Sequence, residues 1–87
     1  MNTSAEAVTL LQQALETTRS AAETIDNLIA VHDYQDVAGL VTLAAAALLE
    51  SAALLMQSQD EAALGALESA DDLLDAVYDI IEGDLDA

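Results

Sequence analysis

The hydrophobic pattern is dominated by one stretch, residues 37–56, in which Glu50 is the only charged residue. On a helical wheel, its large apolar residues cover most of the circumference. One narrow strip of small or polar residues is left over: Gly39, Thr42, Ala46, Glu50, Ala53 and Gln57. A helix that is apolar around most of its circumference is either the centre of a bundle or a membrane span.

The membrane span is the less favoured of these two interpretations. Some twenty residues can cross a bilayer, and six Leu and two Val contribute roughly −2.4 to −4.8 kcal/mol to insertion, but one central acid costs about +2.5 to +3.5 kcal/mol. No Lys or Arg flanks either end, and the N-terminal residues lack the pattern of a secretory signal. We therefore predict a cytoplasmic protein without membrane contact, in which helix 34–57 is buried by its neighbours.

The N-terminal third predicts a conventional amphipathic helix over about residues 4–31. Thr3 or Ser4 can cap its first turn. Apolar residues recur at helical spacing: Val8, Leu11, Leu15, Ala22, Ile25 and Ile29. Arg19 follows Glu16 by three residues and precedes Glu23 by four, a spacing that predicts local ion pairs along the helix.

Two short breaks divide the rest of the chain into helices at about 34–57 and 59–82. Asp33 is the expected N-cap after the first break, and Ser58 with Glu61 has the spacing of a capping box after the second. Gly83 is expected to stop the last helix and to leave a short acidic tail over 83–87. Short connections between long helices imply antiparallel neighbours. The sequence thus predicts an all-α fold, a single-domain, up-down-up three-helix bundle.

Composition agrees with this fold and limits the function. The 87 residues include no Pro, no Cys and only three Gly, which suits helices and leaves no route to a disulfide. Seventeen acids against a single Arg give a formal net charge of −16. This imbalance opposes direct binding to nucleic acid or to an anionic membrane, and it favours a basic protein surface as the partner.

Helix 59–82 carries the densest charge. Its carboxylates form a ladder on one face, the candidate partner-binding site: Glu61, Glu68, Asp71, Asp72, Asp75, Asp79 and Glu82. Like charges three or four residues apart destabilise a helix by a few tenths of a kcal/mol each, and no Lys or Arg on this helix relieves them. Two interpretations stay open: the ladder keeps an apolar chain soluble, or it presents negative groups to a basic surface.

The spacing makes the second interpretation concrete. Residues three or four apart rise by about 4.5 to 6 Å along a helix, and successive phosphates of a duplex strand rise by about 3.4 Å. Laid obliquely along a groove lined by Lys and Arg, the ladder can occupy phosphate positions. In its size, its shortage of basic residues and this ladder, the chain resembles the small acidic phage inhibitors of bacterial defence, including anti-CRISPR and anti-restriction nucleic-acid mimics. The resemblance implies inhibition by binding in the host cytoplasm, without a cofactor or turnover.

Two other functions fit the same sequence. A self-associating structural or adaptor module would form a homodimer through the apolar surface of helix 34–57, with the acids needed only for solubility. A toxin-neutralising immunity protein or antitoxin shares the same general build. In each case a binding function is expected.

No enzymatic activity is predicted, because the chain offers no nucleophile paired with a base, and His32 lies at a predicted helix end. No cofactor and no metal site are expected, since Asp72, Asp75 and Asp79 would share a hard cation only weakly. Glu50 is expected to reach solvent along the strip of small residues.

Overall fold

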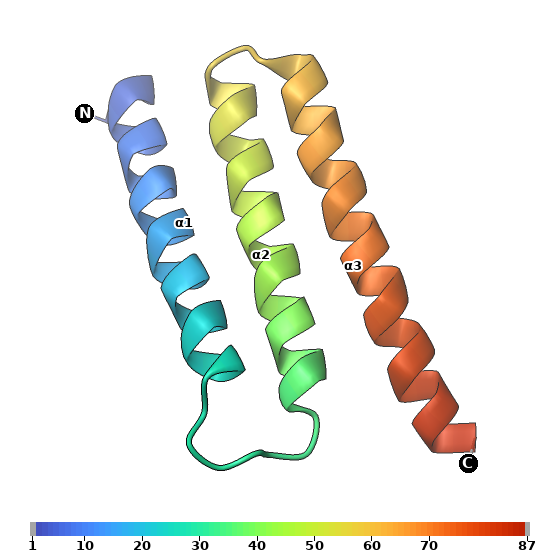
Figure 1. Cartoon of the computed structure of the whole chain (residues 1–87). Helices are drawn as coiled ribbons and strands as arrows, with labels where there is room; N and C mark the ends of the chain where they lie inside the picture. Colours follow the sequence, from blue (N-terminus) through green and yellow to red (C-terminus); the bar gives the residue numbers. More distant parts are fainter. Residues whose placement is uncertain (1, 87) are drawn as a thin grey trace.

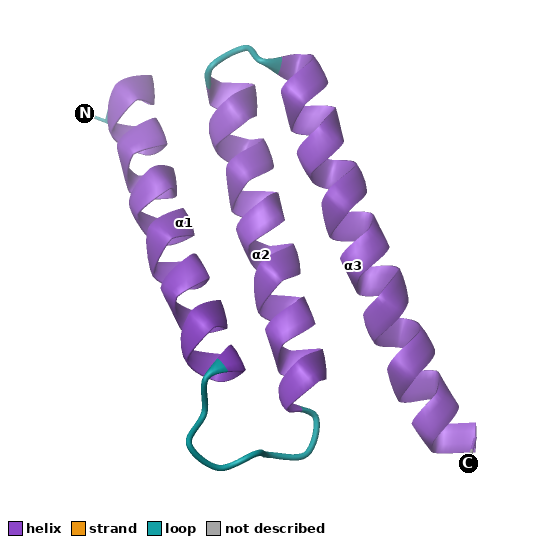
Figure 2. Ribbon diagram, in the orientation of Figure 1, coloured by secondary structure: helices purple, strands orange, loops and turns teal. Residues whose placement is uncertain are grey.

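The computed structural model describes residues 2–86, which form three helices and contain no strand (Figure 1, Figure 2). Helix α1 spans Ser4–Asp26, α2 spans Gln35–Met56 and α3 spans Asp60–Asp86. Successive helices run in opposite directions. The predicted all-α, antiparallel three-helix fold is therefore confirmed.

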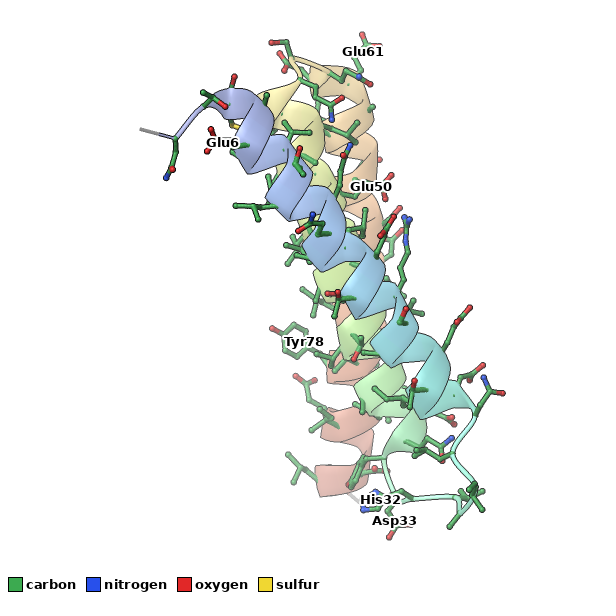
Figure 3. The ribbon with its side chains drawn as sticks, turned by 90° about the vertical axis from the view of Figure 1, so that its left-hand side faces the viewer. Glu6, His32, Asp33, Glu50, Glu61 and Tyr78 are labelled. Carbon is green, nitrogen blue, oxygen red and sulfur yellow. The ribbon has the colours of Figure 1, made fainter. Side chains whose placement is uncertain are left out.

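The three helices form an open layer. Both α1 and α3 pack against α2, whereas within the described residues no Cα atom of α1 lies within 8 Å of a Cα atom of α3. Figure 1 shows α2 between the two outer helices. In the view turned by 90°, the three helices lie one behind another (Figure 3). The layer measures 50 × 28 × 20 Å between Cα atoms. Helix α2 is covered along two lines only, and its two other sides face solvent.

Small residues repeated every seven positions form the contact between α2 and α3. The buried residues are Val37, Ala44 and Ser51 on α2 and Ala63, Ala70 and Val77 on α3. Seven residues make two helical turns, so each set lies in a line along its helix, and antiparallel packing sets Ala44 level with Ala70. These two side chains are 2% and 1% exposed. Their small size lets the helix axes approach closely.

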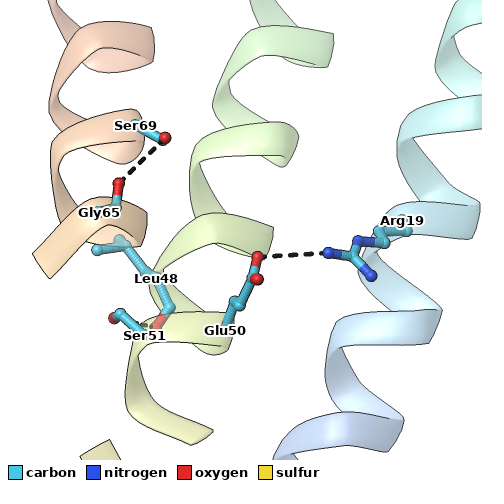
Figure 4. Close-up of polar contacts among 6 residues, drawn as sticks. All are labelled: Arg19, Leu48, Glu50, Ser51, Gly65 and Ser69. Atoms are coloured by element: carbon cyan, nitrogen blue, oxygen red, sulfur yellow. Dashed lines mark hydrogen bonds and ion pairs between the residues drawn. The ribbon is translucent and has the colours of Figure 1, made fainter. Parts of the chain in front are cut away.

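Ser51 is the polar residue in this contact, and its hydroxyl is satisfied within its own helix. Ser51 Oγ donates a hydrogen bond of 2.7 Å to the Leu48 carbonyl oxygen (Figure 4). Among the described residues, no buried side-chain nitrogen or oxygen lacks a hydrogen-bond partner. The serine therefore packs as a small residue without the penalty of an unpaired polar group.

The contact between α1 and α2 uses the strip that was expected to lead Glu50 to solvent. Ala46 and Ala53 are buried, and a Cβ atom built on Gly39 would lie 3.8 Å from Cγ2 of Ile25 on α1. The strip is covered because its small side chains allow α1 to approach closely. The expectation of an open path was wrong, and Glu50 reaches solvent at the margin of the contact, where its side chain is 45% exposed.

Arg19 joins α1 to α2 and does not pair along its own helix. Its Nη2 lies 3.4 Å from Oε2 of Glu50 (Figure 4). The predicted pairs with Glu16 and Glu23 were wrong, because the neighbouring helix brings a carboxylate within reach of the guanidinium group. The two side chains are 57% and 45% exposed, so solvent screening limits this ion pair to well under about 1 kcal/mol of stability.

Helix α1 ends five residues before the predicted boundary at 31. Asn27 ends it, because Nδ2 of Asn27 donates a hydrogen bond of 2.8 Å to the Glu23 carbonyl and competes with helical backbone bonding. Gln35 then holds the loop that follows. Its Nε2 donates to the Ile25 carbonyl at 2.7 Å, and its Oε1 accepts from the His32 backbone N–H at 3.2 Å.

The predicted capping box of Ser58 and Glu61 was also wrong. Ser58 has a φ of 59°, which is left-handed, and its N–H donates to the Leu55 carbonyl at 3.1 Å. The next N–H, that of Gln59, donates to the Leu54 carbonyl at 2.9 Å. This pair of bonds is the Schellman motif that terminates a helix, so Ser58 ends α2 and does not begin α3.

Two further helix ends differ from the prediction. Tyr34, with φ 63° and ψ 15°, is the N-cap of α2 in place of Asp33, and it makes no side-chain capping bond. Gly83 does not stop α3, which continues to Asp86, because this glycine keeps a negative φ. Most of the expected tail is therefore helical, while its last residue, Ala87, lies outside the described residues.

Candidate interaction surfaces

The predicted site residues lie together on the side of α3 that faces away from α2. All seven are exposed: Glu61, Glu68, Asp71, Asp72, Asp75, Asp79 and Glu82. Their direction follows from helical periodicity, because Asp72 and Asp79 each follow a buried contact residue, Ala70 or Val77, by two positions, which is about 200° around the helix. We call these seven residues the acidic edge. Its ends, Glu61 and Glu82, are about 32 Å apart at a rise of about 1.5 Å per residue.

No basic side chain neutralises the acidic edge within the described part of the chain. Helix α3 contains no Lys or Arg, and Arg19, the single Arg of the chain, is paired with Glu50 in the contact between α1 and α2. Within residues 2–86, no three His, Asp or Glu side chains are close enough to one another to hold a metal ion. The edge therefore presents separate, solvent-facing negative charges.

A second surface is apolar and covers one side of the layer. It comprises Leu10, Val41, Leu48, Leu55, Leu64 and Tyr78, which are 45% to 65% exposed. We call these six residues the apolar face. They come from all three helices, and the sequence had pointed only to the middle one.

The positions of these residues follow from Glu50 and Tyr78, which lie on opposite sides of the layer in Figure 3. Leu48 precedes Glu50 by two residues, about 200° around α2, and so points to the side of Tyr78. The residues seven before and seven after Leu48 share its direction. On α1, Arg19 is the partner of Glu50, and Leu10 precedes Arg19 by nine residues, which is about 180° around the helix. Leu10 therefore points to the side of the layer on which Leu48 and Tyr78 lie.

The residues of the apolar face are exposed because the small-residue contacts use only two lines of α2. Each contact accepts side chains no larger than Val on the α2 side. The larger leucines, which the sequence placed in a buried helix, consequently lie beside these lines. Large apolar side chains exposed together on one side of a protein are typical of an interaction site.

The loop between α1 and α2 is also apolar and exposed. Leu28, Ile29 and Val31, expected inside the first helix, are exposed on this loop. His32 follows Val31 in this loop, next to Asp33 (Figure 3), and its Nδ1 is 2.6 Å from the Asp33 carbonyl oxygen. The histidine is thus a surface residue engaged with the backbone.

An open groove of about 600 Å³ lies between α1 and α2. Its lining includes Arg19, Glu23, Asp26 and Asp36 together with aliphatic side chains. Because carboxylates outnumber the guanidinium group, which is already paired with Glu50, the groove offers little attraction to an anionic ligand.

The hydroxyl of Tyr34 interacts with the end of α3. Hydrogen bonding to the Asp84 carboxylate raises the pKa of Tyr34 above its usual value of 10.0, and the negative charges of Asp84 and Asp33 act in the same direction. A carboxylate beside the hydroxyl favours the neutral phenol over the phenolate.

We predict that the pKa of Tyr34 falls toward 10.0 in Asp84→Ala, measured by phenolate absorbance with Tyr78→Phe as the background. Since the folded-state pKa is raised, the interaction stabilises the fold below the unfolded-state pKa of about 10 and is lost as the pH rises through the folded-state value. An unchanged titration midpoint in Asp84→Ala would show that the two groups do not interact.

Helix α2 is, within the described residues, long and apolar enough to cross a membrane by length and composition alone. Core helices of soluble proteins share this property, so it assigns no membrane role. In this structure both of its small-residue lines are occupied by α1 and α3.

No family model matches the chain, and neither a curated protein nor a solved structure is similar to it. The functional argument therefore starts from the acidic edge and the apolar face themselves.

Proposed function

We propose that this protein is a non-enzymatic inhibitor that covers the nucleic-acid-binding surface of a basic protein with its acidic edge. The observation that carries the proposal is the exposure of all seven carboxylates along one outer edge of the layer. An ordinary solvated helix would mix acidic and basic residues, whereas α3 has no basic residue. The repulsion along the helix is relieved when the edge meets a positive surface.

The dimensions of the edge support nucleic-acid mimicry. Its length of about 32 Å, at about 1.5 Å per residue, is close to one turn of duplex DNA, about 34 Å. A groove that binds one turn of duplex would therefore meet carboxylates along its whole length. Because α1 does not contact α3, the edge projects from the side of a thin layer and can enter such a groove.

The resemblance to phage inhibitors of bacterial defence supports the same proposal through size and charge. It gives the proposed partner class, a nucleic-acid-binding component of a defence complex, and the proposed location, the cytoplasm of the host. Inhibition of this kind needs no catalytic group, and the one histidine lies on the exposed loop with a backbone partner. A toxin-neutralising protein would use the acidic edge in the same way against a basic toxin.

The test is capture of a partner from a host lysate at low salt, with this protein immobilised. We expect a basic protein to be retained, and excess duplex DNA to release it because both ligands compete for one surface. Neutral dextran at the same mass concentration serves as the control and should release nothing. A retained protein that excess duplex DNA fails to displace would contradict nucleic-acid mimicry.

A further inference from the structure

We propose that a second copy of this chain covers the apolar face, so that two layers stack into a homodimer. The face spans all three helices, and its six side chains are 45% to 65% exposed. In a monomer these side chains would stay in water and would not gain the free energy of apolar burial. The inference concerns a surface separate from the acidic edge and does not depend on the proposed function.

Charge identifies a second copy as the occupant. Each chain carries a net charge of −16, so two copies approach most easily through the surface that carries the fewest acids. Between Val41 and Leu55 on α2, Glu50 is the only charged residue, and its side chain points to the side of the layer opposite the apolar face. On α1, the neighbours of Leu10 at two-turn spacing, Thr3 and Thr17, are uncharged as well.

Acidic residues adjoin the face on two helices, with Glu6 beside Leu10 on α1 and Asp71 on α3. Asp71 lies midway between Leu64 and Tyr78, seven residues from each, and so shares their direction and belongs to both the α3 part of this side and the acidic edge. Along α2, the centre of this side, a basic partner would find no carboxylate to pair with. The uncharged centre therefore matches another uncharged surface, as in a self-complementary interface.

The side of the layer that carries the apolar face is large enough for a stable dimer interface. The two larger Cα extents of the layer, 50 Å and 28 Å, multiply to a projected area of about 1400 Å². A standard protein interface buries about 800 Å² per partner. Somewhat more than half of this side would therefore need to be covered, which the six apolar side chains allow because they are distributed over three helices.

The acids also select the orientation of the two copies. If the two-fold axis runs parallel to the helices, α3 of one copy lies over α1 of the other, and the two acidic edges are on opposite sides of the dimer. If the axis runs across the helices, α3 lies over α3 and brings Asp71 of each copy close to the other acidic edge. Like charges held close together are strongly unfavourable, so we infer the axis parallel to the helices.

Sedimentation equilibrium of Leu48→Glu tests the dimer. We expect the wild-type chain to be dimeric and Leu48→Glu to raise the dimer dissociation constant by at least about a hundredfold, because symmetry places two unpaired charges in one interface. The matched control is Leu43→Glu, since Leu43 and Leu48 are 44% and 45% exposed on opposite sides of α2. The control should dimerise like the wild type.

Leu10→Glu provides a second variant if Leu48→Glu fails to fold. Leu10 is on α1 and 65% exposed, so the substitution spares α2 and should weaken the dimer in the same direction, with helicity retained by circular dichroism. A monomeric wild type, or a folded Leu10→Glu variant that dimerises as tightly as the wild type, would overturn the proposal.

Cysteine cross-linking tests the orientation, and the chain has no native cysteine to interfere. With the axis parallel to the helices, Val41→Cys should form a disulfide with its own copy under mild oxidation. If disulfides form only between Val41→Cys and Leu55→Cys chains in a mixture, the copies pack with their α2 helices antiparallel, and the inferred orientation is wrong.

Ionic strength separates this inference from the proposed function. Salt screens repulsion between two chains of the same charge, so the dimer should tighten as salt rises. Binding of a basic partner through the acidic edge should weaken under the same change. Opposite salt responses therefore identify which surface is being measured.

Discussion

Replacement of Asp72 and Asp79 by lysine should weaken binding of the basic partner by at least about a hundredfold and leave the helical fold intact. Both side chains are exposed near the centre of the acidic edge, so the substitutions remove two attractions and create two repulsions. Juxtaposed like charges cost several kcal/mol, and each 1.4 kcal/mol changes the dissociation constant about tenfold. Titration calorimetry against the captured partner measures the effect.

The matched control for this charge reversal is Glu16→Lys with Glu23→Lys on α1. These two exposed acids are also seven residues apart, and their reversal changes the net charge by the same amount, from −16 to −12. If bulk charge drives binding, the two double variants will weaken it equally. If the acidic edge is the binding surface, the α1 variant will retain most of the affinity, and only equal losses contradict the proposed site.

The second large effect is expected in the contact between α2 and α3. Ala70→Leu should lower the free energy of unfolding by about 1 to 3 kcal/mol, because three added heavy atoms must fit where the side chain is 1% exposed. For a domain of this size, that loss lowers the thermal midpoint by roughly 4 to 24 °C. Thermal unfolding followed by circular dichroism measures it.

Ala62→Leu is the control for this substitution, since Ala62 lies on the same helix and is exposed. We expect its thermal midpoint to stay within a few degrees of the wild type, because surface substitutions usually change stability by less than about 0.5 kcal/mol. If Ala70→Leu is as stable as Ala62→Leu, the small-residue contact does not determine how closely α2 and α3 approach.

Local sequence signals predicted the helices well and their ends less well. The periodicity of α3 gave its acidic edge, because the side-chain direction in a helix depends only on residue spacing. Helix ends depend on competing backbone and side-chain hydrogen bonds. Ser58 illustrates this, since the same residue type caps the start of a helix or, in a left-handed conformation, ends one.

The sequence analysis anticipated only part of the apolar face, an apolar surface on the middle helix, and missed the contributions of α1 and α3. Large apolar residues cover α2 around most of its circumference, and this pattern was taken to indicate burial on every side. A signal was nevertheless present in the chain: Ala44 and Ser51 on α2, and Ala63 and Ala70 on α3, repeat at intervals of seven. Small residues at this spacing indicate close helix contacts, which leave the larger neighbours outside.

The sequence by itself determined the three helices, their alternating direction and the position of the carboxylates on one face of α3, because these depend on residue spacing and loop length along a single chain. Only the tertiary structure decided that α1 and α3 do not meet, that Arg19 pairs with Glu50, and that Leu43, Leu48 and Leu55 of α2 are exposed. The physical reason is that helix packing is selected by which side chains fit between two axes. That choice depends on residues from two helices at once.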